Sequence, residues 1–290
     1  MTKKSKKTIA YLELIAAGVS WGFIGLFTRN LSAAGIGADN IALLRCVGSA
    51  LFSTVFFALA DRSAFHITLR DVPLHFGNGV LSTLGSAYFY MYCQTQCSLA
   101  VSGILLYTAP AIVVVLSVFI LKEKLTKSKV VALALTTLGC ALVTGIFGGG
   151  QSCTPLGLFY GLCSGFTYAL YSIFSFYLLK RNSANGVTMW SYVFASLALP
   201  FLLHPDELPL FVSSGSVVFH AFGLVFFGSL LPAWLYTKGL EYVEASRAQM
   251  IVALEPAVAA LVGIFVFGEP MSAAVFAGLG CIIASIYILR

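Results

Sequence analysis

Long apolar runs, broken by short polar segments, extend along the whole chain. About 20 mostly apolar helical residues span about 30 Å of hydrocarbon, so each long run predicts a membrane-crossing helix. The runs are continuous and do not alternate, which favours a helical bundle over a β-barrel. Ten helices are predicted, over residues 8–28, 40–60, 72–95, 99–121, 128–147, 155–179, 187–203, 216–238, 245–267 and 271–289.

The overall composition supports the same fold class. Hydrophobic residues make up 59% of the chain, charged residues only 10%, and the mean hydropathy is +0.93. A water-soluble domain carries roughly a quarter of charged residues on its surface. The chain therefore has too few charges to be covered by water. We predict an all-α, multi-pass protein of the cytoplasmic (inner) membrane, without a large soluble domain.

The positive charges predict an orientation. If the N-terminus is cytoplasmic and ten helices alternate, 15 of the 17 Lys and Arg residues fall on the cytoplasmic side, leaving only Arg29 and Arg45 elsewhere. Such asymmetry favours this orientation, with both termini cytoplasmic. The four lysines within residues 3–7 resemble the start of a signal peptide, but no small-residue cleavage site follows. The basic residues are not interleaved with aromatic ones, so no nucleic-acid partner is expected. Membrane lipid is the expected surrounding partner.

The two halves of the chain are related in sequence. A shift of 146 residues aligns three pairs, and a shift of 147 aligns two more: Tyr90 with Tyr236, Pro110 with Pro256, Glu123 with Glu269, Gly18 with Gly165, and Trp21 with Tyr168. Five helices per half is an odd number, so the second copy is predicted to be inverted in the membrane. Residues 1–148 would form the first repeat and residues 149–290 the second, within one transmembrane domain. Inverted repeats are a transporter architecture with the substrate site between the halves.

The seven cysteines are predicted to be reduced core residues. Their number is odd, and they form no CxxC motif and no Cys/His cluster, so no metal site is expected. A disulfide remains an alternative for the two that lie near predicted loops, Cys97 and Cys153. The others are Cys46, Cys93, Cys140, Cys163 and Cys281.

A family resemblance rests on motifs in four predicted helices: Trp21–Gly22, Arg45, Ala109–Pro110 with Glu123, and Glu255–Pro256 with Glu269. With them the chain resembles the drug/metabolite transporter superfamily, in its EamA branch, over essentially its whole length. Each motif is loose, but their order and spacing are fairly specific. The resemblance implies ten helices, cytoplasmic termini, and a cavity lined mainly by helices 1, 3, 4, 6, 8 and 9. It also implies transport of amino acids and other metabolites, often outward. The first half departs from the second in having Ala109 where the second has Glu255.

Glu255 is an acid within the apolar run from Met250 to Phe267. A charge at such depth costs about 2.5–3.5 kcal/mol on insertion scales, so the side chain should face the bundle interior. Two interpretations are open. The carboxylate could bind a substrate amine or a proton, or a neutral acid could hydrogen-bond the carbonyls freed by Pro256.

Aromatic residues on the helices that the resemblance places around the cavity supply further candidates. Their rings offer stacking and cation–π surfaces, although core and interfacial positions also attract aromatics. The predicted substrate-binding residues are Trp21, Tyr88, Tyr107, Tyr168, Trp234 and Glu255. Pro110 and Pro256 are candidate hinges, or plain packing residues. Arg45 is interpreted as snorkelling to the membrane surface, with guidance of an anionic group as the alternative, and His75 and His220 as core or interface residues.

Together these features predict a secondary transporter or facilitator for small organic solutes. Amino acids and similar neutral, zwitterionic or aromatic compounds are expected, probably exported by alternating access. The helices lack paired cations, which argues against phosphorylated substrates. No GxxxxGK[ST] motif is present, so ATP is not expected to drive transport directly. An integral membrane enzyme acting on lipid-linked substrates is the alternative, but clustered acids, histidines or a metal site would be needed. No cofactor and no catalytic residue are predicted; the oligomeric state is open.

Overall fold

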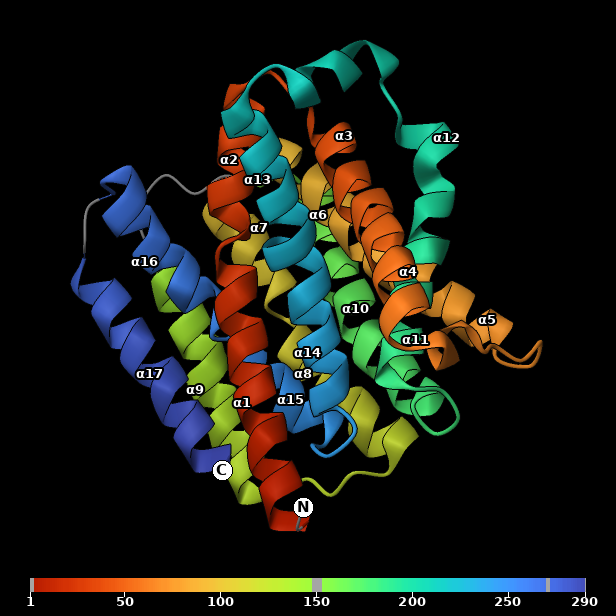
Figure 1. Cartoon of the computed structure of the whole chain (residues 1–290). Coiled ribbons are helices and arrows are strands. Elements are labelled where there is room, and N and C mark those ends of the chain that lie inside the picture. Colours follow the sequence, from red (N-terminus) through yellow and green to blue (C-terminus); the bar gives the residue numbers. More distant parts are fainter. Residues whose placement is uncertain (1–2, 148–152, 270–271, 290) are drawn as a thin grey trace.

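The computed structural model is a bundle of helices with both chain termini at the same end (Figure 1). It describes residues 3–147, 153–269 and 272–289. We call the end that carries the termini the terminal end, and the other the opposite end. Within the described ranges no strand forms, and a single bridge joins Cys97 and Cys153. Gly148–Gly150, at the predicted boundary between the halves, lie outside the described residues.

The helical elements follow one another with short connections. The α-helices are α1 (Lys3–Gly22), α2 (Ile24–Ala33), α3 (Ala38–Leu43), α4 (Ser49–Ala60), α5 (Val72–Phe76), α6 (Gly85–Gln96), α7 (Leu99–Leu106), α8 (Ala109–Leu116), α9 (Lys127–Val143), α10 (Pro155–Leu178), α11 (Ala184–Ala195), α12 (Leu199–Leu202), α13 (Gly215–Val225), α14 (Leu231–Gly239), α15 (Ala245–Val252), α16 (Glu255–Phe267) and α17 (Ala273–Leu289). Short π-helical turns are η1 (Leu44–Gly48), η3 (Gly77–Leu84), η4 (Ser117–Leu121) and η7 (Phe226–Leu230), and 3₁₀ turns are η2 (Arg62–Phe65), η5 (Ser196–Ala198) and η6 (Pro205–Val212).

Helical backbone occupies each of the ten predicted stretches, which confirms the all-helical fold class. Six helical stretches among the described residues are long and apolar enough to cross a membrane, and a seventh is added if α11–α12 and η6 count as one bent span. The bend between them is 120°. α17 is apolar but shorter, with 17 residues. The count of ten crossings stays a prediction.

The bend before η6 is held by a carboxylate from that segment. Glu207 Oε2 accepts hydrogen bonds from the backbone N–H of Gly37, at 2.7 Å, and from Asn40 Nδ2, at 2.8 Å. It thereby provides an acceptor for the N–H of Gly37, the residue before α3, and ties the Asn40 side chain to the same carboxylate. The Gly37 bond, then the Asn40 bond, lowers the pKa of Glu207 from its ordinary value. η6 thus lies across the opposite end, against the start of α3 (Figure 1).

Two of the long helical stretches are interrupted in the middle. Backbone turns at residues 107–108 separate α7 from α8, and turns at residues 253–254 separate α15 from α16. Pro110 and Pro256 each occupy the second position of the new helix, where a missing N–H leaves no intrahelical bond unmade. Each proline is therefore accommodated by a fresh helix start within the long stretch.

Local structure recurs at the offset of 146 residues that aligns the halves. α7 and α15, α8 and α16, and α9 and α17 all begin 146 residues apart. Lys122 and Gly268 both adopt left-handed backbone, with φ of 60° and 69°. The next residues, Glu123 and Glu269, donate their N–H groups to the carbonyls six residues earlier. The repeat is thus visible in backbone geometry, whereas its boundary near residue 148 and its inversion in the membrane stay predictions.

α9 and α17, which are equivalent in the repeat, lie against each other through small residues (Figure 1). A Cβ atom on Gly139 would lie 2.9 Å from the carbonyl oxygen of Gly278, and one on Gly278 would lie 2.8 Å from that of Gly139. Glycine is needed at both positions because the two backbones touch. Thr136 Oγ1 and Ser285 Oγ add a hydrogen bond of 3.0 Å across the pair. Such contacts join membrane helices where apolar burial offers little driving force.

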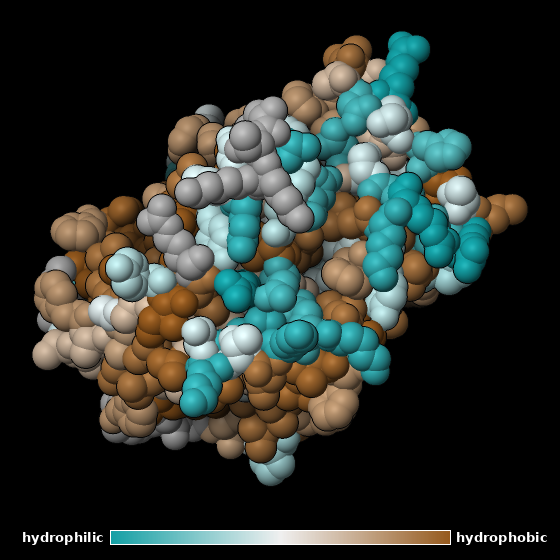
Figure 2. All heavy atoms as spheres, turned by 90° about the horizontal axis from the view of Figure 1, so that it is seen from below, coloured by the Kyte–Doolittle hydropathy of each residue, from teal (hydrophilic) through white to brown (hydrophobic). Residues whose placement is uncertain are grey.

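Polar and basic side chains gather at the terminal end. The connections α8–α9, α10–α11 and α14–α15 all lie there, with the basic residues they carry (Figure 1). Seen from this end, hydrophilic side chains cover the middle of the bundle and one side of it, and apolar ones much of the rim (Figure 2). This distribution matches the grouping of charges on which the predicted orientation rests.

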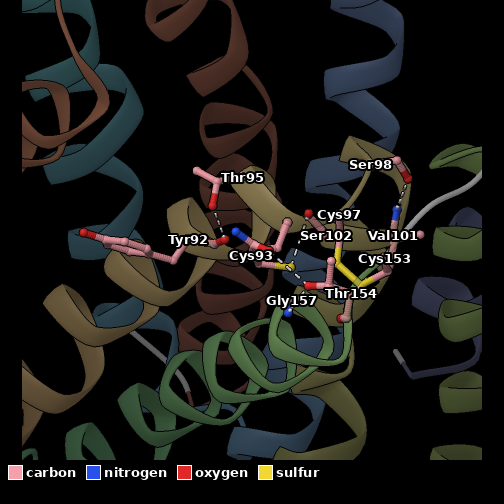
Figure 3. The surroundings of a disulfide bond; sticks show 11 residues. Tyr92, Cys93, Thr95, Cys97, Ser98, Val101, Ser102, Cys153, Thr154 and Gly157 are labelled. Carbon is pink, nitrogen blue, oxygen red and sulfur yellow. Dashed lines mark hydrogen bonds between the residues drawn. A yellow bond between two sulfur atoms is a disulfide. The ribbon is translucent and has the colours of Figure 1, made fainter.

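The structure corrects the prediction for two of the cysteines. Cys97, after α6, and Cys153, before α10, form a disulfide with Cα atoms 4.0 Å apart (Figure 3). Beside it the N–H of Thr154 donates to the carbonyl of Gln96, at 3.1 Å. The partners are separated by 56 residues in sequence, and their places near predicted loops, which left this disulfide open as the alternative, were the only sequence signal. Both belong to the opposite end, and the five other cysteines are free.

We expect the unfolded, unreduced protein to react with five equivalents of a maleimide, because two of its seven thiols are joined. After reduction it should react with seven. Intact-mass spectrometry of denatured samples purified with the thiols blocked distinguishes the two counts. Seven adducts before reduction would show that the bond does not form in the cell. Cys97→Ser should give six adducts without reduction, since Cys153 then becomes free.

Candidate functional site

Four of the predicted site residues meet in the interior of the bundle. Glu255 is the first residue of α16 and is half-buried. Its carboxylate lies close enough to interact with the hydroxyls of Tyr107, at the α7–α8 break, and Tyr168, on α10. The Tyr168 ring meets the Trp21 ring of α1 edge-on, with centroids 6.2 Å apart. We call these four residues the central cluster.

The two helix breaks place the cluster where it is. α15 ends at Val252, so the N-terminus of α16 opens inside the bundle beside the Glu255 carboxylate. Unpaired N–H groups at a helix start favour an anion there. The counterpart break in the first half begins at Tyr107, whose ring reaches the same carboxylate. One interruption therefore provides the acid and the other an aromatic hydroxyl.

Glycines on neighbouring helices let the breaks approach closely. A Cβ atom on Gly18 would lie 3.1 Å from the carbonyl oxygen of Val252, and one on Gly165 would lie 2.7 Å from that of Leu105. A Cβ atom on Gly22 would overlap Val258 and lie 3.0 Å from the carbonyl oxygen of Glu255. The backbone of α1 therefore lies directly against the start of α16. This contact explains the Trp21–Gly22 pair: the glycine admits α16, and the tryptophan beside it joins the cluster.

A buried polar group continues from the cluster toward the terminal end. The ring of Tyr236 lies 5.7 Å from that of Trp21, between centroids. Its hydroxyl donates to Gln249 Oε1 at 2.8 Å and contacts Ser172 Oγ at 2.6 Å. Ser172 Oγ donates to the same Gln249 oxygen at 3.2 Å, and Tyr168 lies close to Gln249. The site thus extends from the Glu255 acid to neutral hydrogen-bonding groups on α10, α14 and α15.

Arg45 turns into the bundle, so its interpretation as a snorkelling residue is wrong. Its Nε donates to Ser229 Oγ at 3.1 Å, and Ser229 is fully buried. The guanidinium is close enough to act electrostatically on Glu255 and Tyr168. Arg45 lies in η1 and Ser229 in η7, two π-helical turns from different halves of the chain. Turns of this kind often mark functional positions in helices.

Tyr88 and Trp234 lie away from the central cluster. Tyr88 packs against Tyr92, with ring centroids 4.5 Å apart, in an aromatic group between α6 and α10. Trp234 Nε1 donates to Asn185 Oδ1 at 2.6 Å, and Lys238 Nζ lies 4.5 Å from the centre of its ring. The structure therefore joins Trp21, Tyr107, Tyr168 and Glu255 but not these two residues.

Tyr90 and Tyr236 are the neighbours that the sequence prediction omitted. Tyr90 is close enough to Glu255 and Tyr107 for electrostatic interaction, and Tyr236 contacts Trp21. A signal was available, because these two tyrosines align with each other at the offset of 146 residues. Tyr88 and Trp234, which were chosen instead, each stand two positions away on the same helix, where side chains point to another face.

Pro110 and Pro256 flank the cluster directly. Both are buried. Pro110 follows Tyr107 by three residues, and Pro256 directly follows Glu255. Movement at either break would shift a cluster residue, so the hinge role stays a prediction with a defined geometry. Among the described residues, no three His, Cys, Asp or Glu side chains come together as metal ligands would.

The chemistry on offer is recognition of a polar solute with an apolar part. A carboxylate in a low-dielectric interior attracts an ammonium group strongly, and a guanidinium attracts a carboxylate. Rings of Trp21 and Tyr168 offer faces and edges to an apolar or cationic group.

Comparison with known proteins places this geometry in a transporter family. The model of the EamA-like transporter family matches residues 8–145 and again residues 155–290. An uncharacterized transporter of Archaeoglobus fulgidus is 28% identical over 289 residues, covering 95% of this chain and 94% of its own. The uncharacterized transporter YojE of Bacillus subtilis is 24% identical, covering 98% and 93%. An uncharacterized inner membrane transporter of Salmonella typhimurium, YicL, is also 24% identical, covering 96% and 94%.

A solved crystal structure shares the fold. Its TM-score is 0.80 over 96% of this chain and 95% of that one, at 18% sequence identity. The family model matches the two halves separately, on either side of the segment that follows α9. Two matches in tandem agree with the recurrence of helix boundaries described above. The chain belongs to the EamA-like transporter family of multi-pass membrane proteins.

Proposed function

We propose that the protein carries small zwitterionic or aromatic solutes, amino acids among them, outward across the cytoplasmic membrane by alternating access. The observation that supports this proposal most strongly is the position of the Glu255 carboxylate at a helix start inside the bundle. Two tyrosine hydroxyls and the Arg45 guanidinium lie near it. An amino acid fits this set: its ammonium group faces Glu255, its carboxylate faces Arg45, and its side chain contacts Trp21 or Tyr168.

The interrupted helices support the same proposal. Transporters with inverted repeats bind their substrates where discontinuous helices expose half-helix ends near the midplane. Here α7–α8 and α15–α16 break at equivalent positions, and both breaks contribute to the central cluster. The breaks also give each half a flexible point at the site, as a carrier that opens to alternate sides requires.

Counterflow in proteoliposomes tests the proposed function. Vesicles holding the protein and an unlabelled amino acid inside should accumulate the same labelled amino acid from outside, and a panel of the common amino acids identifies the preferred solute. Vesicles without protein give the background. If neither amino acids nor other small zwitterions or aromatic compounds exceed it, the proposal fails.

Tyr107→Ala is expected to lower this counterflow by about tenfold. It removes a hydroxyl close to Glu255 and a ring from the cluster, and a hydrogen bond to a charged group is worth about 1.5–3 kcal/mol. Tyr88→Ala is the matched control, because the same truncation occurs outside the cluster. Equal losses in both variants, at equal amounts of folded protein, would mean that the aromatic site is misplaced.

The orientation has its own test in two equivalent residues. Thr126 and Ser272 both cap the helix that follows them, α9 and α17, and stand 146 residues apart. If the repeat is inverted, Thr126→Cys should react with a membrane-impermeant maleimide only from the cytoplasm, and Ser272→Cys only from outside. Labelling of both from one side would remove the inverted repeat.

A further inference from the structure

A buried ionic network closes the terminal end. Glu123 precedes α9, and its carboxylate crosses to the start of α15 in the other half. There Oε1 accepts from the N–H of Ala245 at 2.9 Å, and Oε2 accepts from the hydroxyl of Ser246. Lys129 Nζ contacts Glu123 Oε2 at 2.9 Å and Glu244 Oε2 at 3.2 Å. The Lys129 side chain is only 2% exposed and that of Glu123 only 7%.

The Glu123 carboxylate caps α15 although it lies far from that helix in the sequence. The first N–H groups of a helix have no partner within it, and an anion there also gains from the helix dipole. Glu244 precedes α15, but its own side chain makes no capping bond. Glu123 therefore supplies the cap in its place. As long as this contact persists, α8–α9 of the first half and α15 of the second are joined at the terminal end.

The equivalent acid at the other end is engaged differently. Glu269 occupies the position of Glu123 in the second half, with the same left-handed residue before it and the same N–H bond to a carbonyl six residues back. Its carboxylate pairs with Arg29 of α2 at 2.6 Å, and the two side chains are 44% and 48% exposed. The opposite end thus has an acid of matching backbone geometry in an open, solvated pair.

The repeat indicates where Glu269 would go. Glu123 caps the helix that begins at Ala245, and the residue 146 positions before Ala245 is Leu99, the first residue of α7. α7 follows directly after Cys97 at the opposite end. A carboxylate that caps α7 from Glu269 would accept from the N–H of Leu99, as Glu123 accepts from that of Ala245. Ala100 stands in place of Ser246, and Ser98 Oγ already accepts from the N–H of Val101 at 3.4 Å, so the second contact would be the weaker one.

We propose that Glu123 and Glu269 are alternating latches: Glu123 holds the terminal end shut by capping α15, and, when it lets go, Glu269 leaves Arg29 and caps α7 to shut the opposite end. This inference rests on the proposed alternating access, and it names the groups that close each end of the carrier. The conformation described here is the one with the Glu123 latch engaged.

The two latches are unequal in charge. Lys129 pairs with both Glu123 and Glu244, whereas Val275 stands at its equivalent position near Glu269. The terminal-end latch therefore has a buried cation that the other lacks. The carrier without solute accordingly rests with its terminal end closed.

Spin-label distances at equivalent positions test the latches. Lys127 and Glu241 flank the terminal end, and Ala273 and Thr95 are their repeat counterparts at the opposite end; all four are exposed. Each pair is changed to cysteine in a protein whose partly exposed thiols, Cys163 and Cys281, are replaced by serine. Counterflow by this background confirms that it is intact, and pulsed dipolar spectroscopy in lipid nanodiscs then gives the populations of near and far distances.

Glu123→Gln should raise the population with a long Lys127–Glu241 distance by about tenfold, since losing a charged cap shifts a two-state ratio by that order. Glu269→Gln should shift both distances the other way. Arg29→Met provides the decisive contrast. It frees Glu269 to cap α7, so it should shorten the Ala273–Thr95 distance, opposite in sign to Glu269→Gln.

Equal signs for Arg29→Met and Glu269→Gln would overturn the proposal, because two partners of a merely structural ion pair act alike. Unchanged distances in Glu123→Gln would overturn it as well. Failure of the proposed function looks different: no solute would show counterflow, while the distances could still respond to the three substitutions.

Discussion

Glu255→Gln is expected to reduce counterflow of a zwitterionic solute by about ten- to a hundredfold. Glutamine keeps the shape of the side chain and can interact with the hydroxyls of Tyr107 and Tyr168, but it carries no charge to offer an ammonium group. A hydrogen bond to a charged group is worth about 1.5–3 kcal/mol, which corresponds to that range of affinity. Flux at saturating and at low solute concentration, measured across a series of pH values, separates lost binding from lost proton transfer.

The control is Glu241→Gln, which neutralises an exposed acid at the terminal end. It should leave flux unchanged, since Glu241 contacts no cluster residue in the structure. The structural interpretation of Glu255 makes the opposite prediction. If the acid only braces the helix start before Pro256, glutamine should serve nearly as well. Near-normal flux with an unaltered pH profile in Glu255→Gln would therefore leave the proposed substrate contact without support.

Lys129→Met is expected to cost about 3–5 kcal/mol of unfolding free energy, the usual penalty when one partner of a buried ion pair is removed. Methionine fits the volume of the lysine stem but leaves the carboxylate of Glu123 without its buried cation. Equilibrium unfolding in mixed micelles, followed by tryptophan fluorescence, provides the measurement.

Arg29→Met is the matched comparison, because it removes the cation from the equivalent acid at the opposite end. That pair is about half exposed, and exposed ion pairs contribute about 0–1 kcal/mol. The two substitutions should therefore differ by several-fold in their effect on stability. Similar losses of stability in both variants would mean that water reaches the terminal-end network more than the 2% exposure of the Lys129 side chain indicates.

The helices could be predicted from the sequence because each is a long, mostly apolar run, and lipid imposes that pattern directly. Which face of a helix points inward was harder to read. α6 carries aromatic residues at positions 88, 89, 90 and 92, on most sides of its circumference. Only Tyr90 faces Glu255. On α14, likewise, Tyr236 faces the cluster and Trp234 does not. In both cases the residue preserved by the 146-residue offset is the one that faces inward.

Long-range pairings were the part that the sequence could not predict. Arg45 finds Ser229 184 residues away, and nothing near either residue signals the contact. The lone-charge rule for membrane helices allows either an interior partner or a snorkelling side chain. The choice depends on how η1 and η7 meet. The disulfide between Cys97 and Cys153 depends in the same way on α6 and α10 converging at the opposite end.

That disulfide constrains how the carrier can move. It joins the end of α6, from the first half, to the start of α10, from the second. These two helix ends must therefore move together. α7 begins two residues after Cys97 and moves with them. Under the proposed alternating access, the opposite end would then open and close by movement of α16 relative to these joined helix ends. A covalent bond between the halves would thus keep one side of the opposite end fixed and leave the other side to move.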